Sequence, residues 1–151
     1  MIGNDLVDLY CASIESNWKR KGFLDKLFTT SEKTQIRSGE NPFLLVWKYW
    51  TMKEAAYKIY SRMTGIRSFA PVKLCCTLGE HTFGTVQIDD LKFYTCTEMT
   101  ENYIHTIAGL QSDQLAKIRI EIIHYSGELP AYASKNPACV SHHGHYLALV
   151  Y

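Results

Sequence analysis

Two stretches of this sequence, far apart along the chain, hold acidic and basic side chains that could do chemistry together. Near the N-terminus, IGNDLVDL contains Asp5 and Asp8, and YWTMKEAAYKIY contains Glu54 and Lys58. Carboxylates from the end of a strand and from a helix can converge on one hard cation, and Mg²⁺ prefers one or two carboxylates together with water and substrate phosphates. Taken separately, the two aspartates are typical of a surface turn, and a glutamate followed four residues later by a lysine is a common pair on a helix surface.

The second stretch belongs to a predicted long helix. Asn41 followed by Pro42 is typical of an N-cap and a first helical position. The helix is predicted to run to about Met63 and to end before Gly65. Apolar side chains recur along it at spacings of four and three, and this stripe is predicted to pack on a sheet. The stripe consists of Leu45, Tyr49, Met52, Ala56, Ile59 and Met63.

The opposite face of this helix carries an unusual combination of side chains. Glu54 lies two residues past Met52, about 200° around the helix, and it shares its face with Lys58, Trp47 and Trp50. If the apolar stripe is the core contact, the opposite face should be exposed to water. Two tryptophans on it suggest instead that a ligand or another subunit covers it.

The rest of the chain is predicted to be helical in its first half and to form strands in its second. Residues 1–7 are predicted to form a short strand, and Thr29, three residues before Glu32, indicates a capping box. The pair at 89–90 indicates a tight hairpin. Helices followed by consecutive strands are typical of an α+β domain, with helices packed on one face of a mainly antiparallel sheet, and we expect one domain over residues 1–151. The later strands are predicted at 72–78, 83–88, 91–97, 103–110, 118–124 and within the C-terminal ACVSHHGHYLALVY.

The composition argues against several classes of protein. A formal net charge of +1 gives no bulk attraction to nucleic acid or to a membrane surface. No apolar run approaches the roughly 20 residues that span a bilayer, and the N-terminus lacks the basic residues of a signal peptide. The five cysteines contain no C-x-x-C pair, so we expect reduced thiols in a cytoplasmic protein and no zinc site.

Four motifs, taken in order, resemble those of one family. IGNDLVDL is similar to the G-x-D motif of 4'-phosphopantetheinyl transferases, and WTMKEAAYK is similar to their W/F-x-x-K-E-A/S-x-x-K motif. LFTTSE resembles the F-T-x-x-E segment, and VSHHGHYLALVY resembles the S-x-S-H-x-x-x-Y-A-x-A-x-V strand pair. The order and rough spacing are those of the short, holo-acyl-carrier-protein synthase type, and the motifs run from residue 2 to residue 151.

The resemblance implies an activity. Such enzymes move the 4'-phosphopantetheine arm of coenzyme A onto a serine of an acyl or peptidyl carrier protein, and 3',5'-ADP leaves. Asp5 and Glu54 match the ligands of Mg²⁺, and Glu54 or a metal-bound water is a candidate general base for the serine. Lys58 matches the lysine at the diphosphate, where it would stabilise negative charge and assist proton transfer. These matches imply that Glu54 and Lys58 are catalytic.

The resemblance also implies binding residues and partners. Lys53 is expected to contact a phosphate of coenzyme A, and Ser141 and His142 match the segment that holds phosphate or nucleotide groups. Short members of the family are typically homotrimers whose subunits share the cleft, so a homotrimer is implied here. No nucleic-acid or membrane partner is expected, and both fatty-acid and secondary-metabolite carrier proteins stay open as substrates.

The sequence departs from the family pattern in places. Val7 stands where longer members keep a second metal-binding glutamate, and Asp8 matches the acid of the short type, as either a metal-site residue or a structural one. The C-terminal motif reads VSHHGH, which makes the alignment of His142 less direct. A transition-metal site at His143 and His145 is disfavoured, because a turn is predicted at Gly144. The histidines at 81, 105 and 124 are expected to be ordinary packing or surface residues.

Two further interpretations follow from the sequence. The segment WKRKGFLDK contains Lys19, Arg20, Lys21 and Lys26, which are either a solvated surface or a docking site for an acidic carrier protein. The alternative to an enzyme is a non-catalytic homologue that binds coenzyme A or a carrier protein without transfer.

Overall fold

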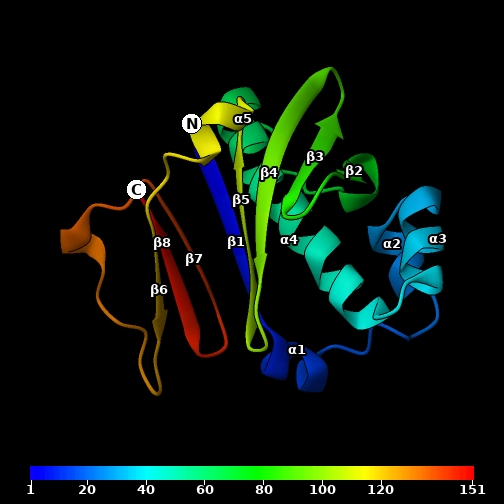
Figure 1. The fold of residues 1–151 in the computed structure, drawn as a ribbon, viewed down its shortest axis with the longest axis horizontal. Coiled ribbons are helices and arrows are strands. Elements are labelled where there is room, and N and C mark those ends of the chain that lie inside the picture. The colour runs from blue at the N-terminus through cyan, green and yellow to red at the C-terminus, as the bar shows by residue number, and fades with distance from the viewer.

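The computed structural model describes residues 1–151 and consists of two antiparallel sheets and a set of helices, of which one is long (Figure 1). No helix has both the length and the apolar character needed to cross a membrane. In chain order the elements are β1 (Ile2–Asp8), α1 (Leu9–Glu15), α2 (Phe23–Leu27), α3 (Thr30–Ser38), α4 (Pro42–Thr64), η1 (Pro71–Lys73), β2 (Cys75–Leu78), β3 (Phe83–Ile88), β4 (Leu91–Met99), β5 (Tyr103–Gly109), α5 (Ser112–Leu115), β6 (Ile120–His124), η2 (Ala133–Lys135), β7 (Cys139–His143) and β8 (Tyr146–Val150).

The predicted α+β class is confirmed, and the strands divide into two sheets. The larger has the order β1-β5-β4-β3-β2 and the smaller β6-β8-β7, and all pairs are antiparallel. The predicted hairpin at residues 89–90 joins β3 to β4, with Asp89 at φ +51°. A single sheet was expected. Instead, β7 lies beside β1 in Figure 1 but pairs only with β8 in a backbone ladder.

Helix α4 begins and ends where the sequence predicts. The Asn41 side chain accepts a hydrogen bond from the Leu44 amide, Pro42 opens the helix, and Gly65 follows it in the left-handed conformation. The middle of the predicted apolar stripe packs on the larger sheet, and its members from Tyr49 to Ile59 are fully buried. Met63, in the last turn, is 42% exposed, because the helix there extends past the core.

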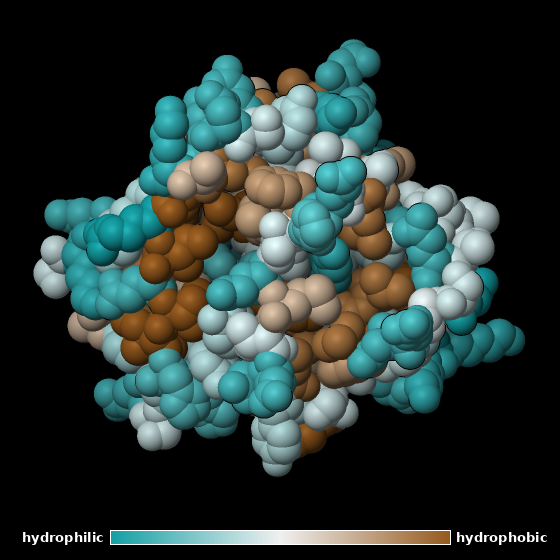
Figure 2. All heavy atoms as spheres, viewed as in Figure 1, coloured by the Kyte–Doolittle hydropathy of each residue, from teal (hydrophilic) through white to brown (hydrophobic).

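The opposite face of α4, which was expected to be covered by a ligand or another subunit, is partly covered by the chain itself, and Trp50, Glu54 and Lys58 on it are half-buried. On this face Trp47 is only 7% exposed, and Lys53, on the adjoining flank of the helix, is completely buried. The cover comes from the same chain, because α3 packs beside α4 and the α2–α3 connection and η1 approach Lys53. Side chains around most of the circumference of α4 are therefore buried or half-buried. On the face seen in Figure 2, hydrophobic side chains gather over the strands, and the rim is mostly hydrophilic.

Other local predictions have mixed outcomes. The capping box is confirmed, since Thr29 and Glu32 exchange hydrogen bonds at the start of α3. The turn predicted at Gly144 is also confirmed, with φ +55°. The strand predicted over 72–78 begins only at Cys75, because Pro71 opens a 3₁₀ turn first. The short helices α1, α2 and α5 were not predicted, since they span seven residues or fewer and show little periodicity.

A close contact between β1 and α4 sets the geometry of the site. At Gly3 the strand passes so near the helix that an added Cβ would collide with the carbonyl oxygen of Ala55 and lie 3.1 Å from Cγ1 of Ile59. Glycine is thus required for its lack of a side chain. The contact places Asp5, two residues along β1, beside the turn of α4 that holds Glu54.

Substituting this glycine should destabilise the protein through overpacking. We expect Gly3→Ala to lower the free energy of unfolding by about 3 kcal/mol, because backbone faces the new methyl group and neither element can move away cheaply. Chemical denaturation measures the change. Gly127→Ala is the control, since Gly127 has φ +81° with nothing within 4 Å, and it should cost only about 1 kcal/mol. Equal effects of the two substitutions would contradict the close contact.

Candidate active site

A cleft of about 610 Å³ brings together most of the residues that the sequence singled out. Asp5 comes from β1, Glu54 and Lys58 from α4, and Ser141 and His142 from β7. The remaining wall is largely apolar, and both tryptophans belong to it. These other lining residues are Leu6, Val7, Ala12, Ser16, Phe23, Leu27, Trp47, Trp50, Val140 and His143.

Asp5 is held by a cation and a hydroxyl. Its Oδ1 lies 3.3 Å from Lys58 Nζ and accepts a hydrogen bond from Ser141 Oγ at 3.2 Å. Lys58 Nζ also donates to the backbone oxygen of Asn4 at 2.6 Å. Burial raises the pKa of the Asp5 carboxyl above its ordinary value, although Lys58 and Ser141 act in the opposite direction. The ion pair with Lys58 thus compensates only part of the desolvation cost.

Glu54 is a second acid in the cleft with a raised pKa. Its pKa is raised to about 7, first by burial and then by the negative charge of Asp5, while Lys58 opposes the shift. The two carboxylates are therefore close enough to repel each other. A carboxyl group that titrates near neutral pH can accept or release a proton under physiological conditions.

The pair of carboxylates fits a hard divalent cation. Mg²⁺ is usually bound by one or two carboxylates, with waters and substrate phosphates completing the octahedron. No three His, Cys, Asp or Glu side chains converge as in an all-protein metal site, so Asp5 and Glu54 are the residues that could hold such an ion. A cation between them would relieve the repulsion that raises the pKa of Glu54.

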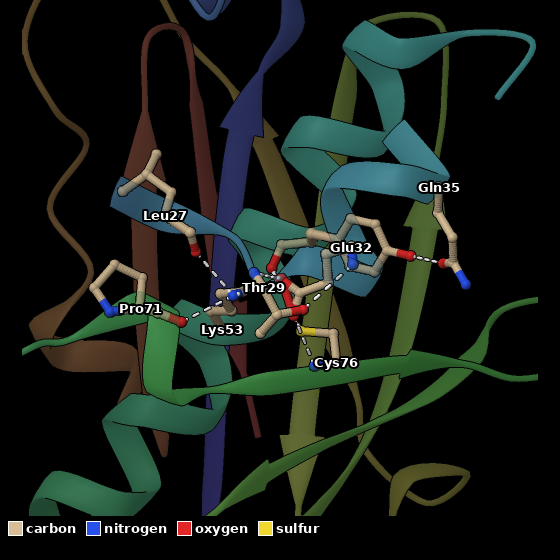
Figure 3. A network of polar contacts seen from close by, with 8 residues as sticks. Leu27, Thr29, Glu32, Gln35, Lys53, Pro71 and Cys76 are labelled. Carbon is tan, nitrogen blue, oxygen red and sulfur yellow. Dashed lines mark hydrogen bonds and ion pairs between the residues drawn. The ribbon is translucent and has the colours of Figure 1, made fainter. Parts of the chain in front are cut away.

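The structure corrects the prediction that Lys53 contacts a phosphate. Lys53 Nζ lies 2.7 Å from Glu32 Oε2 and donates to the carbonyl oxygens of Leu27 and Pro71 at 2.9 and 2.8 Å (Figure 3). These three acceptors match the three N–H groups of an ammonium, and neither side chain of the ion pair is exposed. Lys53 points away from the cleft and holds the loops around α4.

Glu32 completes this buried network. Its Oε2 accepts from the Thr29 amide and its Oε1 accepts from the Cys76 amide at 3.0 Å, so that it joins α3 to β2 (Figure 3). The capping box signalled Glu32 in the sequence. Its pairing with Lys53, 21 residues later, carried no local signal.

Asp8 has a structural position. It does not line the cleft; its Oδ1 accepts from the Cys11 amide at the start of α1, and its Oδ2 accepts from the His145 amide in the β7–β8 turn. Burial opposes its ionisation, but hydrogen bonds from the backbone of His145 and Cys11 hold the pKa of this carboxyl below its ordinary value. Of the two roles considered for Asp8, the contacts agree with the structural one.

His105 agrees with the expectation that it is an ordinary packing residue. His105 is a buried residue of β5, the strand paired with β1, and it contacts the Asn4 side chain at 3.2 Å; burial lowers its pKa to about 4. His143, which the sequence raised only as a disfavoured metal ligand, accepts a hydrogen bond from the Asp8 amide through Nδ1 and lines the cleft. These imidazoles serve as structural groups around the strand that carries Asp5.

Comparison with known proteins gives the family. Residues 1–108 match the model of ACPS, the 4'-phosphopantetheinyl transferase superfamily. The chain belongs to this superfamily. The match includes Asp5, Glu54 and Lys58 and ends within β5, so Ser141 and His142 lie outside it.

A solved structure shares the transferase fold. The crystal structure of holo-[acyl-carrier-protein] synthase from Neisseria meningitidis superposes with a TM-score of 0.59 at 16% identity, covering 71% of this chain and 94% of that chain. No curated protein matches the chain by sequence. At this identity the likeness concerns the fold, and it agrees with the family that the sequence motifs resemble.

The proximity of the two carboxylates can be tested by titration without metal. In the presence of a chelator, carboxyl NMR should give Glu54 a pKa of about 7. Asp5→Asn should lower this pKa, because a neighbouring negative charge is removed, but not to the ordinary value of 4.5, because burial remains. Glu121, which is paired with Lys135 elsewhere, is the internal reference. An unchanged pKa of Glu54 in Asp5→Asn would show that the carboxylates do not interact.

The same shift has a consequence for stability. The folded state binds more protons than the unfolded state between pH 4.5 and about pH 7, so the Glu54 contribution to the free energy of unfolding falls as pH rises through this window. Glu54→Gln should lack that decline. Denaturation of both proteins across the window, again without metal, measures the difference.

Proposed function

We propose that this protein transfers the 4'-phosphopantetheine arm of coenzyme A to a serine of an apo acyl or peptidyl carrier protein, in a Mg²⁺-dependent reaction that releases 3',5'-ADP. The observation that carries the proposal is the convergence of Asp5, Glu54 and Lys58 in one cleft of a superfamily member. A module that only bound coenzyme A would not need two mutually repelling carboxylates beside a lysine. Family membership supports the general class of reaction, and the roles below are our assignment.

The proposed reaction joins the serine oxygen to the β-phosphorus of coenzyme A and breaks the bond from that phosphorus to the oxygen of 3',5'-ADP. Asp5 and Glu54 would hold Mg²⁺, which when bound supplies positive charge at the diphosphate. Lys58, protonated, stabilises the negative charge that develops on the departing nucleotide. Glu54 takes the serine proton directly or through a water.

The apolar wall suits the rest of the substrate. The pantetheine arm is long, uncharged and partly apolar, and the side of the cleft formed by Phe23, Leu27, Trp47 and Trp50 presents aromatic and aliphatic surface. Holding the arm there would align the diphosphate with the polar end of the cleft, and alignment is a large part of catalysis in phosphoryl transfer. This arrangement accounts for tryptophans on the same helix face as Glu54 and Lys58.

The activity is tested by incubating the protein with coenzyme A, Mg²⁺ and several apo carrier proteins, and by measuring the mass gain of the carrier. We expect transfer by the wild type, loss of transfer with a chelator, and a decrease on the order of 10²-fold or more for Glu54→Gln and for Asp5→Asn. Both variants should unfold cooperatively, because each replacement keeps the shape of the side chain. Lack of transfer to every carrier, fatty-acid and otherwise, would favour the non-catalytic homologue.

The carrier protein is proposed to dock near a basic hollow beside α2. Lys19, Arg20, Lys21 and Arg37 line this hollow together with a single acid, Asp25. All of these charged side chains are exposed. Helix α2 also contributes Phe23 and Leu27 to the cleft, so the basic surface adjoins the proposed reaction site. Such a surface would steer an acidic partner towards the cleft.

Charge reversal tests the docking surface. The double variant Lys19→Glu and Arg20→Glu should raise the KM for an acidic carrier protein by about tenfold at low salt and make it less dependent on salt, with little change in the KM for coenzyme A. The control is Lys92→Glu with Lys117→Glu, which changes net charge equally at exposed positions that do not belong to the hollow. If both pairs act alike, only net charge matters and the docking proposal fails.

A further inference from the structure

The C-terminal hairpin is joined to β1 by side chains in place of a backbone ladder. One edge of β1 pairs with β5 in the larger sheet. On the β7 side, Ser141 Oγ accepts from the Leu6 amide at 3.1 Å, and His143 Nδ1 accepts from the Asp8 amide at 2.9 Å. Two residues of β7, two apart in sequence, thus take the places that carbonyl oxygens of a paired strand would occupy.

The first of these contacts fixes the direction of a hydroxyl proton. Ser141 is only 6% exposed, and its oxygen accepts from the Leu6 amide. A serine hydroxyl has one proton, and that proton is directed to Asp5 Oδ1 at 3.2 Å. The contact from Lys58 also ends on Oδ1. Both side-chain hydrogen bonds to the carboxylate therefore hold the same oxygen, Oδ1, and with it the orientation of the group.

We propose that Ser141 is a positioning residue that orients the Asp5 carboxylate for a divalent cation. This inference rests on the proposed function, in which Asp5 holds Mg²⁺. It differs from the role implied by the motif, contact with a phosphate of coenzyme A, because a phosphate oxygen needs a donor and the only proton of this hydroxyl is engaged by Asp5. Hydrogen-bond partners of a ligating carboxylate commonly change metal affinity by about 10–100-fold when they are removed.

The role also explains what the hairpin contributes to the site. Ser141 lies beyond residue 108, where the match to the superfamily model ends. Its contacts are with residues near the N-terminus, 135 and 136 positions away in sequence. The orientation of the carboxylate at the start of the chain is therefore set by a side chain near its end.

The test is Mn²⁺ binding to the folded protein, measured by electron paramagnetic resonance of the free ion, with and without coenzyme A. Ser141→Ala should weaken Mn²⁺ binding by about tenfold or more. Ser141→Thr, which keeps the hydroxyl and suits a strand, should restore it to near the wild-type value. In the transfer assay, Ser141→Ala should raise the Mg²⁺ concentration that gives half-maximal rate, with the KM for coenzyme A nearly unchanged.

His143→Ala is the matched control, because it removes the other hydrogen bond between β7 and β1 but has none to Asp5. Its Mn²⁺ affinity should stay near the wild-type value, and denaturation of every variant verifies folding. Equal loss of Mn²⁺ affinity in His143→Ala and Ser141→Ala would overturn the inference, because docking of the hairpin would then be the cause. Unchanged Mn²⁺ affinity with a raised KM for coenzyme A in Ser141→Ala would overturn it in favour of phosphate binding.

The two proposals fail differently. Wild-type protein that binds Mn²⁺ but transfers nothing would contradict the proposed function, while the three variants would still test the positioning of Asp5. Wild-type protein that binds no Mn²⁺, even with coenzyme A, would remove the metal from the proposed function and overturn the inference with it.

Discussion

Two carboxylates that repel each other inside one cleft are the feature on which the rest of this structure depends. Burial raises the pKa of both Asp5 and Glu54, and the charge of Asp5 raises that of Glu54 further. Placing such groups together lowers the stability of the fold, and the ion pair between Lys58 and Asp5 offsets only part of this loss. A protein retains an arrangement of this kind where it has a use, and binding a divalent cation at a phosphate-bearing substrate is a use that matches the chemistry.

Contacts on several sides hold β1 and α4, the two elements that carry these carboxylates, in place. Gly3 lets β1 approach α4 closely, and the hairpin β7–β8 holds the side of β1 that faces away from β5 through Ser141 and His143. Asp8 ties the same strand to α1 and to the hairpin turn. The N-terminal strand is thus held from several directions, and the position of its carboxylate follows from contacts with elements at both ends of the sequence.

Two neighbouring residues of helix α4, Lys53 and Glu54, have different polar roles. Lys53 turns inward to a buried ion pair with Glu32, and Glu54 turns to the cleft. Successive residues differ by about 100° around a helix, so neighbours in sequence serve separate environments. The buried pair joins α4 to the Leu27 and Pro71 carbonyls. Since Leu27 also lines the cleft, the ion pair holds part of the wall against which the substrate would lie.

Features that depend on a few consecutive residues could be predicted from the sequence. The ends of α4, the capping box at Thr29, the hairpin at residues 89–90 and the turn at Gly144 are local, because each is decided by backbone preferences and by hydrogen bonds within a few positions. The motifs also identified the family, and they identified Asp5 and Glu54 as a pair. The short helices were missed, since so few residues carry little periodic signal.

Only the tertiary structure decided which polar side chains, far apart in the sequence, contact one another. The same motif contains Lys53 and Lys58, and nothing local distinguishes the lysine that is buried against Glu32 from the lysine that faces the cleft. Ser141 matched a segment expected to contact a phosphate, and its hydrogen bonds with Leu6 and Asp5 are not evident from the sequence. The role of a polar side chain depends on the group that it contacts, and for these residues that group lies on a different element. The sequence therefore determined which polar groups are available. The packing determined which of them meet, and so what each of them does.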